Sequence, residues 1–435
     1  MTDYEYFLLP LNDMEFNKTT NNNNNNYNNI EVNISKNMNN NIEIINDFGN
    51  NELDNSNNDM YNGNIERNSK AKQSRVYWVD CLRIFSSILV VYIHVSFINT
   101  ERGSIFSHNW NGLFLHNSIP RHCVPLFVMI SGIFFLNPDK KITLKKLYMK
   151  NIFHMVKSYL FWSSYYAIIN KYVVNLYHTK YTLNMSLIGQ TIYDIILASD
   201  HLWYLPFVIG LYIMTPIYRS IVKERPTAWY IVIISMFLSQ FLPTLISIFV
   251  NILNININMV IDFFKNFKIE LVGSFSVYYI LGHLLYTHNF NNKKKYFFLW
   301  YVIGIVCLMI TVILRFLEVY NKKDEEDNDF GKYNNFFVAL TAISTFIFFK
   351  YNVSKWIDPL MKNEIIKKIV LKLSECSFGI YLVHMTVYDI LHRFNFHSVT
   401  LDPYYWIPFY SMIVYIICFL LIYLLRKIEL FKLVT

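Results

Sequence analysis

The sequence predicts an all-α, polytopic membrane protein with about ten transmembrane helices. Hydrophobic residues make up 54% of the 435 residues and charged residues only 16%, whereas soluble chains are nearer a quarter charged. The polar residues are concentrated in the first 70 positions, so the rest of the chain is more apolar still. The basic residues form short clusters between apolar runs, which is typical of membrane loops.

The first element is a polar tail. Residues 1–70 are dominated by asparagine and include the run Asn21–Asn26. Such a tract has too little apolar surface to offset the entropy lost on ordering. We therefore expect a disordered cytosolic tail over 1–70, followed by one transmembrane domain over 75–430.

The apolar segments follow from Tyr77 onward. A helix needs about 20 apolar residues to cross the hydrocarbon core. The candidate spans are 77–98, 120–137, 152–173, 203–221, 228–250, 269–287, 296–317, 333–350, 376–394 and 405–426. The segment 120–137 is short and starts at Pro120, and 187–198 is too short to span. The latter predicts an interfacial or re-entrant helix.

Basic residues set the predicted orientation. If the tail is cytosolic, every even-numbered connection is basic and the odd-numbered ones are not. The cytosolic clusters are Lys140, Lys141, Lys145, Lys146 and Lys150; Arg219, Lys223 and Arg225; Lys293, Lys294 and Lys295; and Lys355, Lys362, Lys367, Lys368 and Lys372. The positive-inside rule then predicts an even number of helices with both termini cytosolic.

Several function classes are disfavoured. The net charge of +8 does not predict nucleic-acid binding, because the basic residues form no single stripe. None of the five cysteines forms a C-x-x-C pair, so neither a zinc site nor a disulfide framework is indicated. The sequence carries no metal-ligand spacing and no phosphate-cradling glycine loop. We expect no metal and no bound cofactor.

The first span, YWVDCLRIFSSILVVYIHVSF, carries the most informative residues. Arg83 and His94 are eleven residues apart, which places them on one helix face, roughly 16 Å apart. Asp80 and Ser87 fall near the same stripe and are candidate orienting residues. A buried arginine should face protein or a water-filled cavity. Two interpretations stay open: a structural Asp80–Arg83 ion pair, or a substrate path from Arg83 to His94.

The D-x-x-R-x10-H pattern of Asp80, Arg83 and His94 is similar to the signature of the acyltransferase-3 family. Three further stretches resemble that family in the right order, namely RHCVPLFVMISGIFF at 121–135, HLWYLPFVIGLYIMTP at 201–216 and SFGIYLVH at 377–384. The resemblance covers about 75–430. It is greatest to the single-domain sugar O-acetyltransferases, such as the enterobacterial common antigen type.

The resemblance implies an enzyme that moves an acyl group, usually acetyl, from acyl-coenzyme A to a hydroxyl of a carbohydrate or glycolipid. Its partners would be acyl-CoA as donor substrate, the acceptor and membrane lipid, without nucleic acid. Arg83 would meet the donor's phosphates or orient the thioester. His94 would act as general base or carry the acyl group covalently.

Other candidates have two interpretations each. Arg121 and His122 open the second span on the side of His94 and would contact the acceptor or an oxyanion; alternatively, the arginine snorkels to water. His201 and Trp203 open the fourth span, where aromatic belts offer a structural explanation. His384 lies mid-span in the ninth, where an ionisable residue is a functional candidate.

A different class of function also fits part of this pattern. A secondary transporter or channel would place a polar pathway past Arg83, His94 and His384. An inactive relative acting as a receptor or scaffold is a third hypothesis. The order of the four motifs and the lack of an internal repeat favour acyl transfer. The sequence predicts a multi-pass protein of an endomembrane or the plasma membrane.

Overall fold

The chain divides into two units, Met1–Ser74 and Arg75–Thr435. The computed structural model describes only residues of the second unit: 75–97, 104–138, 140, 143–169, 185–197, 200–255, 259, 275–289, 294–323 and 328–435. The predicted tail at 1–70 lies outside the described residues. Within the described residues every regular element is helical, which confirms the predicted all-α class.

The helices follow one another along the chain with short breaks. They are α2 (Tyr77–Phe97), α3 (His108–Ser118), α4 (Cys123–Phe135), α5 (Leu144–Lys146), α6 (Phe153–Ile168), α8 (Met185–Leu197), α9 (Tyr204–Lys223), α10 (Arg225–Met236), α11 (Leu242–Ser247), α13 (Ser276–Thr287), α14 (Lys294–Lys322), α15 (Phe336–Phe348), α16 (Ser354–Leu360), α17 (Glu364–Arg393), α18 (Pro403–Leu425) and α19 (Glu429–Lys432). Several are joined into longer rods by short 3-10 or π-helical turns.

Within the described part of the chain, 7 helical segments are long and apolar enough to cross a membrane. They are Tyr77–Phe97, His108–Phe135, His201–Lys223, Arg225–Ile252, Tyr296–Lys322, Asp329–Leu360 and Pro403–Leu425. This confirms a multi-pass integral membrane protein. The predicted spans 152–173 and 269–287 lie partly outside the described residues, and α17 is long but too polar to join the seven. A total of ten spans and cytosolic termini stay predictions.

The second span differs from its predicted limits. The sequence placed its start at Pro120, but the helical segment begins at His108 and runs through a 3-10 turn at Ile119–His122. A proline is tolerated at the first position of a helical turn because the N–H it lacks would be unpaired there anyway. Pro120 therefore joins α3 to α4 and does not begin the span.

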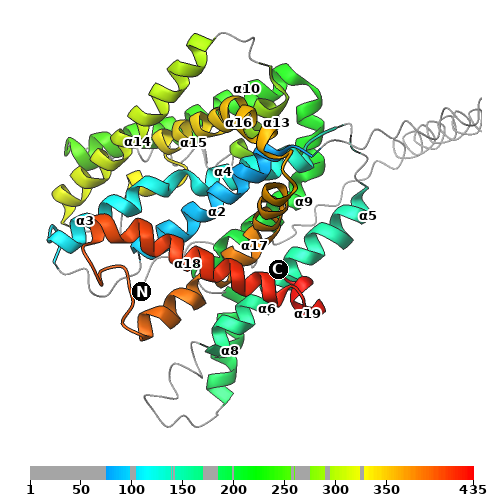
Figure 1. Ribbon diagram of the computed structural model, residues 1–435. Helices are drawn as coiled ribbons and strands as arrows, with labels where there is room; N and C mark the ends of the chain where they lie inside the picture. The colour runs from blue at the N-terminus through cyan, green and yellow to red at the C-terminus, as the bar shows by residue number, and fades with distance from the viewer. Residues whose placement is uncertain are drawn as a thin grey trace, which may run out of the picture. The chain divides into compact units, whose positions relative to one another are not determined.

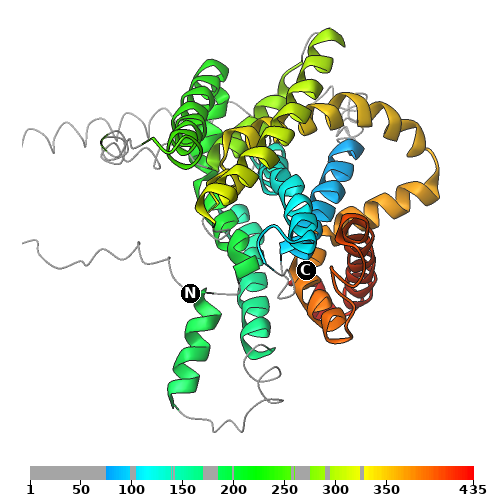
Figure 2. The same cartoon turned by 90° about the vertical axis from the view of Figure 1, so that its left-hand side faces the viewer.

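Helix α2 lies at the centre of this unit, packed against α3, α4, α17 and α18 (Figures 1 and 2). Helix α4 in turn packs very closely on α13. A β-carbon added at Gly132 would lie 1.9 Å from the Tyr279 carbonyl oxygen, and one at Gly282 would lie 2.1 Å from that of Met129. Small residues that let backbones approach are the usual basis of such contacts in membranes. This pair of glycines fixes α4, one wall of the site, against α13.

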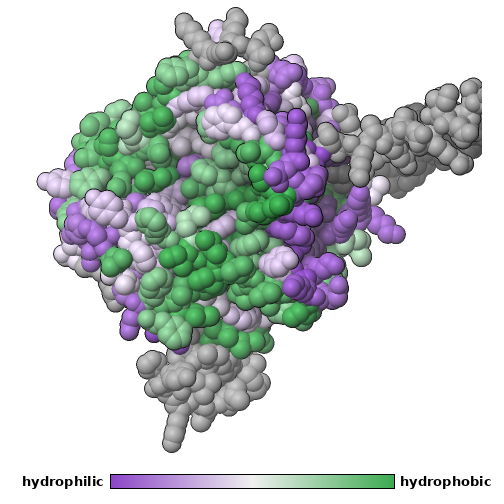
Figure 3. All heavy atoms as spheres, in the orientation of Figure 1, coloured by the Kyte–Doolittle hydropathy of each residue, from purple (hydrophilic) through white to green (hydrophobic). Residues whose placement is uncertain are grey.

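The outer surface agrees with a lipid environment. Figure 3 shows a face whose middle is covered by hydrophobic residues, while hydrophilic residues gather toward its edges. Large apolar side chains stand exposed on α14 and α18, among them Phe298, Ile305, Ile313, Phe409 and Ile416. Apolar exposure on this scale is unfavourable in water and expected against hydrocarbon.

Candidate active site

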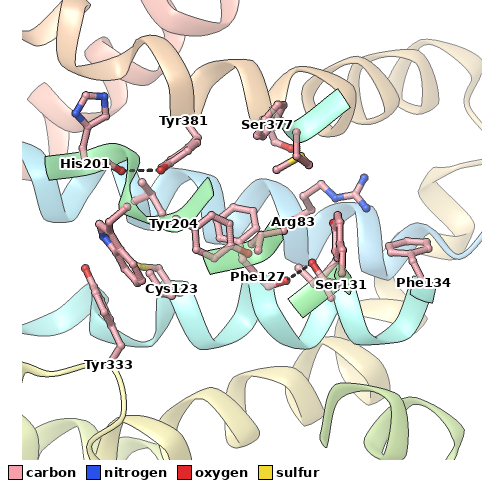
Figure 4. A pocket seen from close by; sticks show the side chains of 18 of the residues that line it. Arg83, Cys123, Phe127, Ser131, Phe134, His201, Tyr204, Tyr333, Ser377 and Tyr381 are labelled. Carbon is pink, nitrogen blue, oxygen red and sulfur yellow. Dashed lines mark hydrogen bonds between the residues drawn. The ribbon is translucent and has the colours of Figure 1, made fainter. Parts of the chain in front are cut away.

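A cavity of about 420 Å³ lies between α2, α4, the start of α9 and α17. Arg83 and His94 both line it, so the two residues predicted to share one face of the first helix open into the same space. Figure 4 shows Arg83 at the end near Ser131 and Phe134, and His201 and Tyr333 at the other end. The walls between them are mainly apolar, including Val90, Val124, Phe127, Ile130, Phe135, Met155 and Phe378. The cavity therefore has a cationic end and an imidazole end.

Asp80 at the cationic end is held mainly by Arg75. The Arg75 guanidinium donates two hydrogen bonds to the Asp80 carboxylate, at 2.8 and 3.0 Å, and Ser374 Oγ donates another at 2.6 Å. The hydrogen bond to Asp80 raises the pKa of Arg75, which stays charged. Asp80 is thus satisfied by partners other than the first-helix arginine.

Arg83 is correspondingly freer. Its Nη1 atom is 4.0 Å from Asp80 Oδ1 and its side chain is 28% exposed. It also donates to Ser374 Oγ at 3.3 Å and lies 5.1 Å from the centroid of the Phe134 ring. The ion pair expected as one alternative exists, but it is long and shared. Arg83 keeps donors directed toward the cavity.

Three histidines meet at the opposite end. The ring centroids of His94 and His384 are 4.9 Å apart, those of His201 and His384 5.5 Å, and those of His94 and His201 6.5 Å. These residues come from α2, the turn before α9 and α17, which are far apart in the sequence. The structure thus brings together three residues that the sequence marked separately.

The hydrogen bond of His384 fixes which nitrogen carries its proton. Its Nδ1 atom is 2.6 Å from the carbonyl oxygen of Tyr381. A carbonyl only accepts, so Nδ1 carries the hydrogen and Nε2 of the neutral ring is an acceptor. His384 is 1% exposed, and among the described residues its Nε2, like that of His201, has no hydrogen-bond partner. Buried polar atoms without partners are uncommon and often mark chemistry.

Three of the candidate residues lie elsewhere. Ser87 hydrogen-bonds to the hydroxyl of Tyr415 on α18, at 3.0 Å, and does not line the cavity. Arg121 donates to the carbonyl of Gly331 at 3.2 Å and to both the backbone and the side chain of Asn117. It neither lines the cavity nor snorkels to water. His122 is buried beside Phe85 and is likewise not a lining residue.

Trp203 does line the cavity, and its indole stacks on the ring of Tyr333 with centroids 5.7 Å apart and planes inclined by 19°. Sequence reasoning did not single out Tyr333, Tyr204 or Tyr381, all of which line the cavity. Tyr204 and Tyr381 lie inside two of the family-like stretches, so the motifs themselves contained that signal. Tyr333 lies in none of them.

Sequence reasoning also passed over two buried charges in α14. Arg315 is 2% exposed and Glu318 is fully buried. A charged pair near the end of an apolar segment is a recognised signal of function or structure in membranes. The predicted span ended at 317, which hid it by placing the glutamate in a loop.

With this geometry in place, comparison with known proteins decides the family. A family model described as an acyltransferase domain, that of the acyltransferase-3 family, matches residues 76–425. The chain belongs to the acyltransferase-3 family. No curated protein and no solved structure matches it significantly. The protein is a membrane acyltransferase, and the matched residues span the whole cavity.

Proposed function

We propose that this acyltransferase moves an acyl group, acetyl in the simplest case, from acyl-coenzyme A to a hydroxyl of a carbohydrate or glycolipid. The observation that carries the proposal is the single cavity that joins Arg83 to His94. A donor with anionic phosphates and a neutral thioester arm needs a cation at one end and apolar walls beyond it. The acceptor hydroxyl needs a base at the other end.

Arg83 is the donor-binding residue in this proposal. A planar guanidinium donates several hydrogen bonds in a fixed fork, which suits phosphate. On the predicted orientation Arg83 lies toward the cytosol, where acyl-CoA is found. The second turn of α2 and the rest of that helix then place His94 roughly 16 Å further along the cavity. That separation leaves room for the arm between the phosphates and the thioester.

His94 is the proposed general base. It takes the proton from the acceptor hydroxyl, whose oxygen attacks the thioester carbonyl carbon. The carbon–sulfur bond breaks, and the thiolate leaves with the proton returned by the imidazolium. The acceptor nitrogen Nε2 of His384 lies beside the ring of His94 and stabilises the positive charge that forms there. In the covalent alternative His94 itself attacks the carbonyl and passes the acyl group to the acceptor.

The test uses purified full-length protein in detergent with acetyl-CoA labelled in the acetyl group. Release of free thiol together with label in water or in added acceptor supports the proposal, and a panel of longer acyl-CoAs gives the chain length. A transporter or channel would cleave no thioester. Acid quenching during turnover separates the two mechanisms, since only the covalent path leaves label on the protein. A wild-type protein that cleaves no acyl-CoA at all would refute the proposal.

A further inference from the structure

The segment Asn328–Asn335, which we call the strap, runs from the end of the acidic loop to the start of α15. It delivers one side chain, Tyr333, to the imidazole end of the cavity (Figure 4). The ring of Tyr333 stacks on Trp203 at 5.7 Å, and its carbonyl accepts a hydrogen bond from the hydroxyl of Tyr278 at 2.8 Å. The strap therefore forms part of the wall where the acceptor would enter.

Glu318 holds the strap from one side. Its carboxylate accepts hydrogen bonds from the backbone N–H groups of Asp329 at 3.1 Å and Phe330 at 3.3 Å. Asn251 Nδ2 and Lys322 Nζ donate to the same carboxylate at 2.8 and 3.0 Å. A carboxylate only accepts, so this fully buried group is matched to four donors. Two of those donors belong to the strap backbone.

Arg315 and Arg121 hold the strap from the other side. Arg315 donates to Ser118 Oγ at 2.6 Å on α3 and to Asn328 Oδ1 at 3.4 Å in the strap. Arg121 donates to the carbonyl of Gly331 at 3.2 Å. The fit is tight, because a β-carbon added at Gly331 would lie 2.8 Å from Arg315 Nε. The strap is clamped between α14 and the junction of α3 with α4.

Charges inside a membrane span are expensive and usually serve a purpose. Arg315 and Glu318 do not line the cavity, yet both bond to the eight-residue segment that supplies Tyr333. Apolar packing would suffice to cover a passive loop. Charged hydrogen bonds fix the position of its backbone within a few tenths of an ångström, which matters where a substrate must be aligned.

We propose that the strap selects the acyl acceptor, with Tyr333 as a specificity-determining residue and Glu318 and Arg315 as positioning residues. This inference rests on the proposed function. The flat stacked pair of Tyr333 and Trp203 offers a ring-shaped acceptor a face to lie against, with its hydroxyl toward His94. The donor end at Arg83 is formed without the strap, so thioester binding and cleavage should not depend on it.

The experiment separates transfer from hydrolysis. Membranes from cells lacking the gene supply the natural acceptor, and labelled acetyl-CoA supplies the donor. Each purified variant is assayed for label transferred to membrane material and for label released to water. Tyr333→Ala should lower the ratio of transfer to hydrolysis by about tenfold or more, as expected when a substrate-aligning contact is lost. Tyr405→Ala is the matched control, because Tyr405 is also a tyrosine and is 77% exposed.

A second pair of variants tests the clamp without touching the cavity. Gly331→Ala pushes against Arg315, whereas Gly210→Ala adds the same methyl group where nothing lies within 4 Å. Gly331→Ala should lower the ratio of transfer to hydrolysis, and Gly210→Ala should leave it unchanged. Glu318→Gln keeps the shape of the side chain but sets an amide donor against the donors of the strap, and should resemble Gly331→Ala.

The outcomes are distinguishable. If the wild type transfers no label, the proposed function has failed. If the wild type transfers label and the Tyr333 and Gly331 variants change transfer and hydrolysis by the same factor, or change neither, the strap does not select the acceptor and the inference is overturned. A selective loss of transfer, with a rise in KM for acceptor and an unchanged KM for acetyl-CoA, supports it.

Discussion

The two clusters of buried polar residues in this protein are satisfied to very different degrees. Around Arg315 and Glu318 the charged atoms meet hydrogen-bond partners from α3, the end of the α10–α11 rod and the strap. Around His94, the neighbouring His201 and His384 each keep a buried nitrogen without a partner among the described residues. A satisfied network stabilises a conformation, whereas an unsatisfied one beside a cavity is available to a substrate. The comparison assigns structure to the first cluster and chemistry to the second.

The largest expected effect lies in the unsatisfied cluster. His94→Ala should lower acyl transfer by about 10²–10⁴-fold, the usual loss on removing a general base, and by more if His94 carries the acyl group. The measurement is kcat for labelled acetyl transfer by purified protein. His108→Ala is a suitable control, because that histidine has a side chain 64% exposed and bonds to Asp402 outside the cavity.

Unfolding measurements on the same two variants complete that test. His94 lines a cavity, so its removal should leave the unfolding transition in detergent nearly unchanged. Full activity per molecule in His94→Ala would remove the main support for the enzymatic assignment. Lost activity together with a large loss of stability would instead move His94 into the structural class and break the contrast between the clusters.

The next largest effect is on stability and lies in the satisfied cluster. Glu318→Ala leaves the cation of Lys322 and two strap N–H groups without their acceptor, and breaking such a buried arrangement costs about 3–5 kcal/mol. Chemical unfolding in mild detergent measures this. Glu429→Ala is the control, since its pair with Lys432 is exposed and such pairs are worth about 0–1 kcal/mol. Equal effects in the two variants would show that the α14 charges stabilise nothing.

How far the sequence predicted these clusters depends on where their residues lie along the chain. Arg83 and His94 could be placed on one face because a single helix relates them by its 3.6-residue period. Their convergence with His201 and His384 could be suspected only from motif order, since no local rule relates α2 to α17. Tyr333 was out of reach. It occupies an irregular segment, and its position depends on hydrogen bonds from residues at 118, 121, 251, 315 and 318.

The start of the second span shows a different limit. Pro120 was taken as a helix boundary, which is the commonest meaning of a proline in an apolar segment. The chain instead continues helical on both sides of it, through a 3-10 turn. The polar residues of α3, such as Asn111 and Asn117, looked like loop composition. In the structure they bond inward, as Asn117 does to the carbonyl of Ile93 at 3.1 Å.

Arg83 allows a sharper test at the donor end. Because Arg75 and Ser374 already satisfy Asp80, Arg83→Ala should cost little stability, under about 1 kcal/mol. It should instead raise KM for acetyl-CoA by about tenfold or more, and Arg83→Lys should recover only part of the loss because lysine lacks the planar fork. A double-mutant cycle with Asp80→Ala measures any coupling. A large coupling energy in stability with an unchanged KM would show that the ion pair is structural.

The smallest effect is expected at Ser87, which lies on the same helix as both proposed site residues but faces α18. Ser87→Ala removes the hydrogen bond to the Tyr415 hydroxyl and leaves that buried hydroxyl without it, which costs about 1–3 kcal/mol. The serine also bonds to the carbonyl of Ile84 at 2.7 Å, a contact the helix does not need, so the cost should fall at the lower end of that range. Tyr415→Phe should cost a similar amount, and the double variant little more than either, because both remove one bond. Acyl transfer by Ser87→Ala should equal that of the wild type. A fall in kcat with unchanged stability would place Ser87 within the reach of the substrate, and the cavity would then extend along a face of α2 that the structure closes with α18.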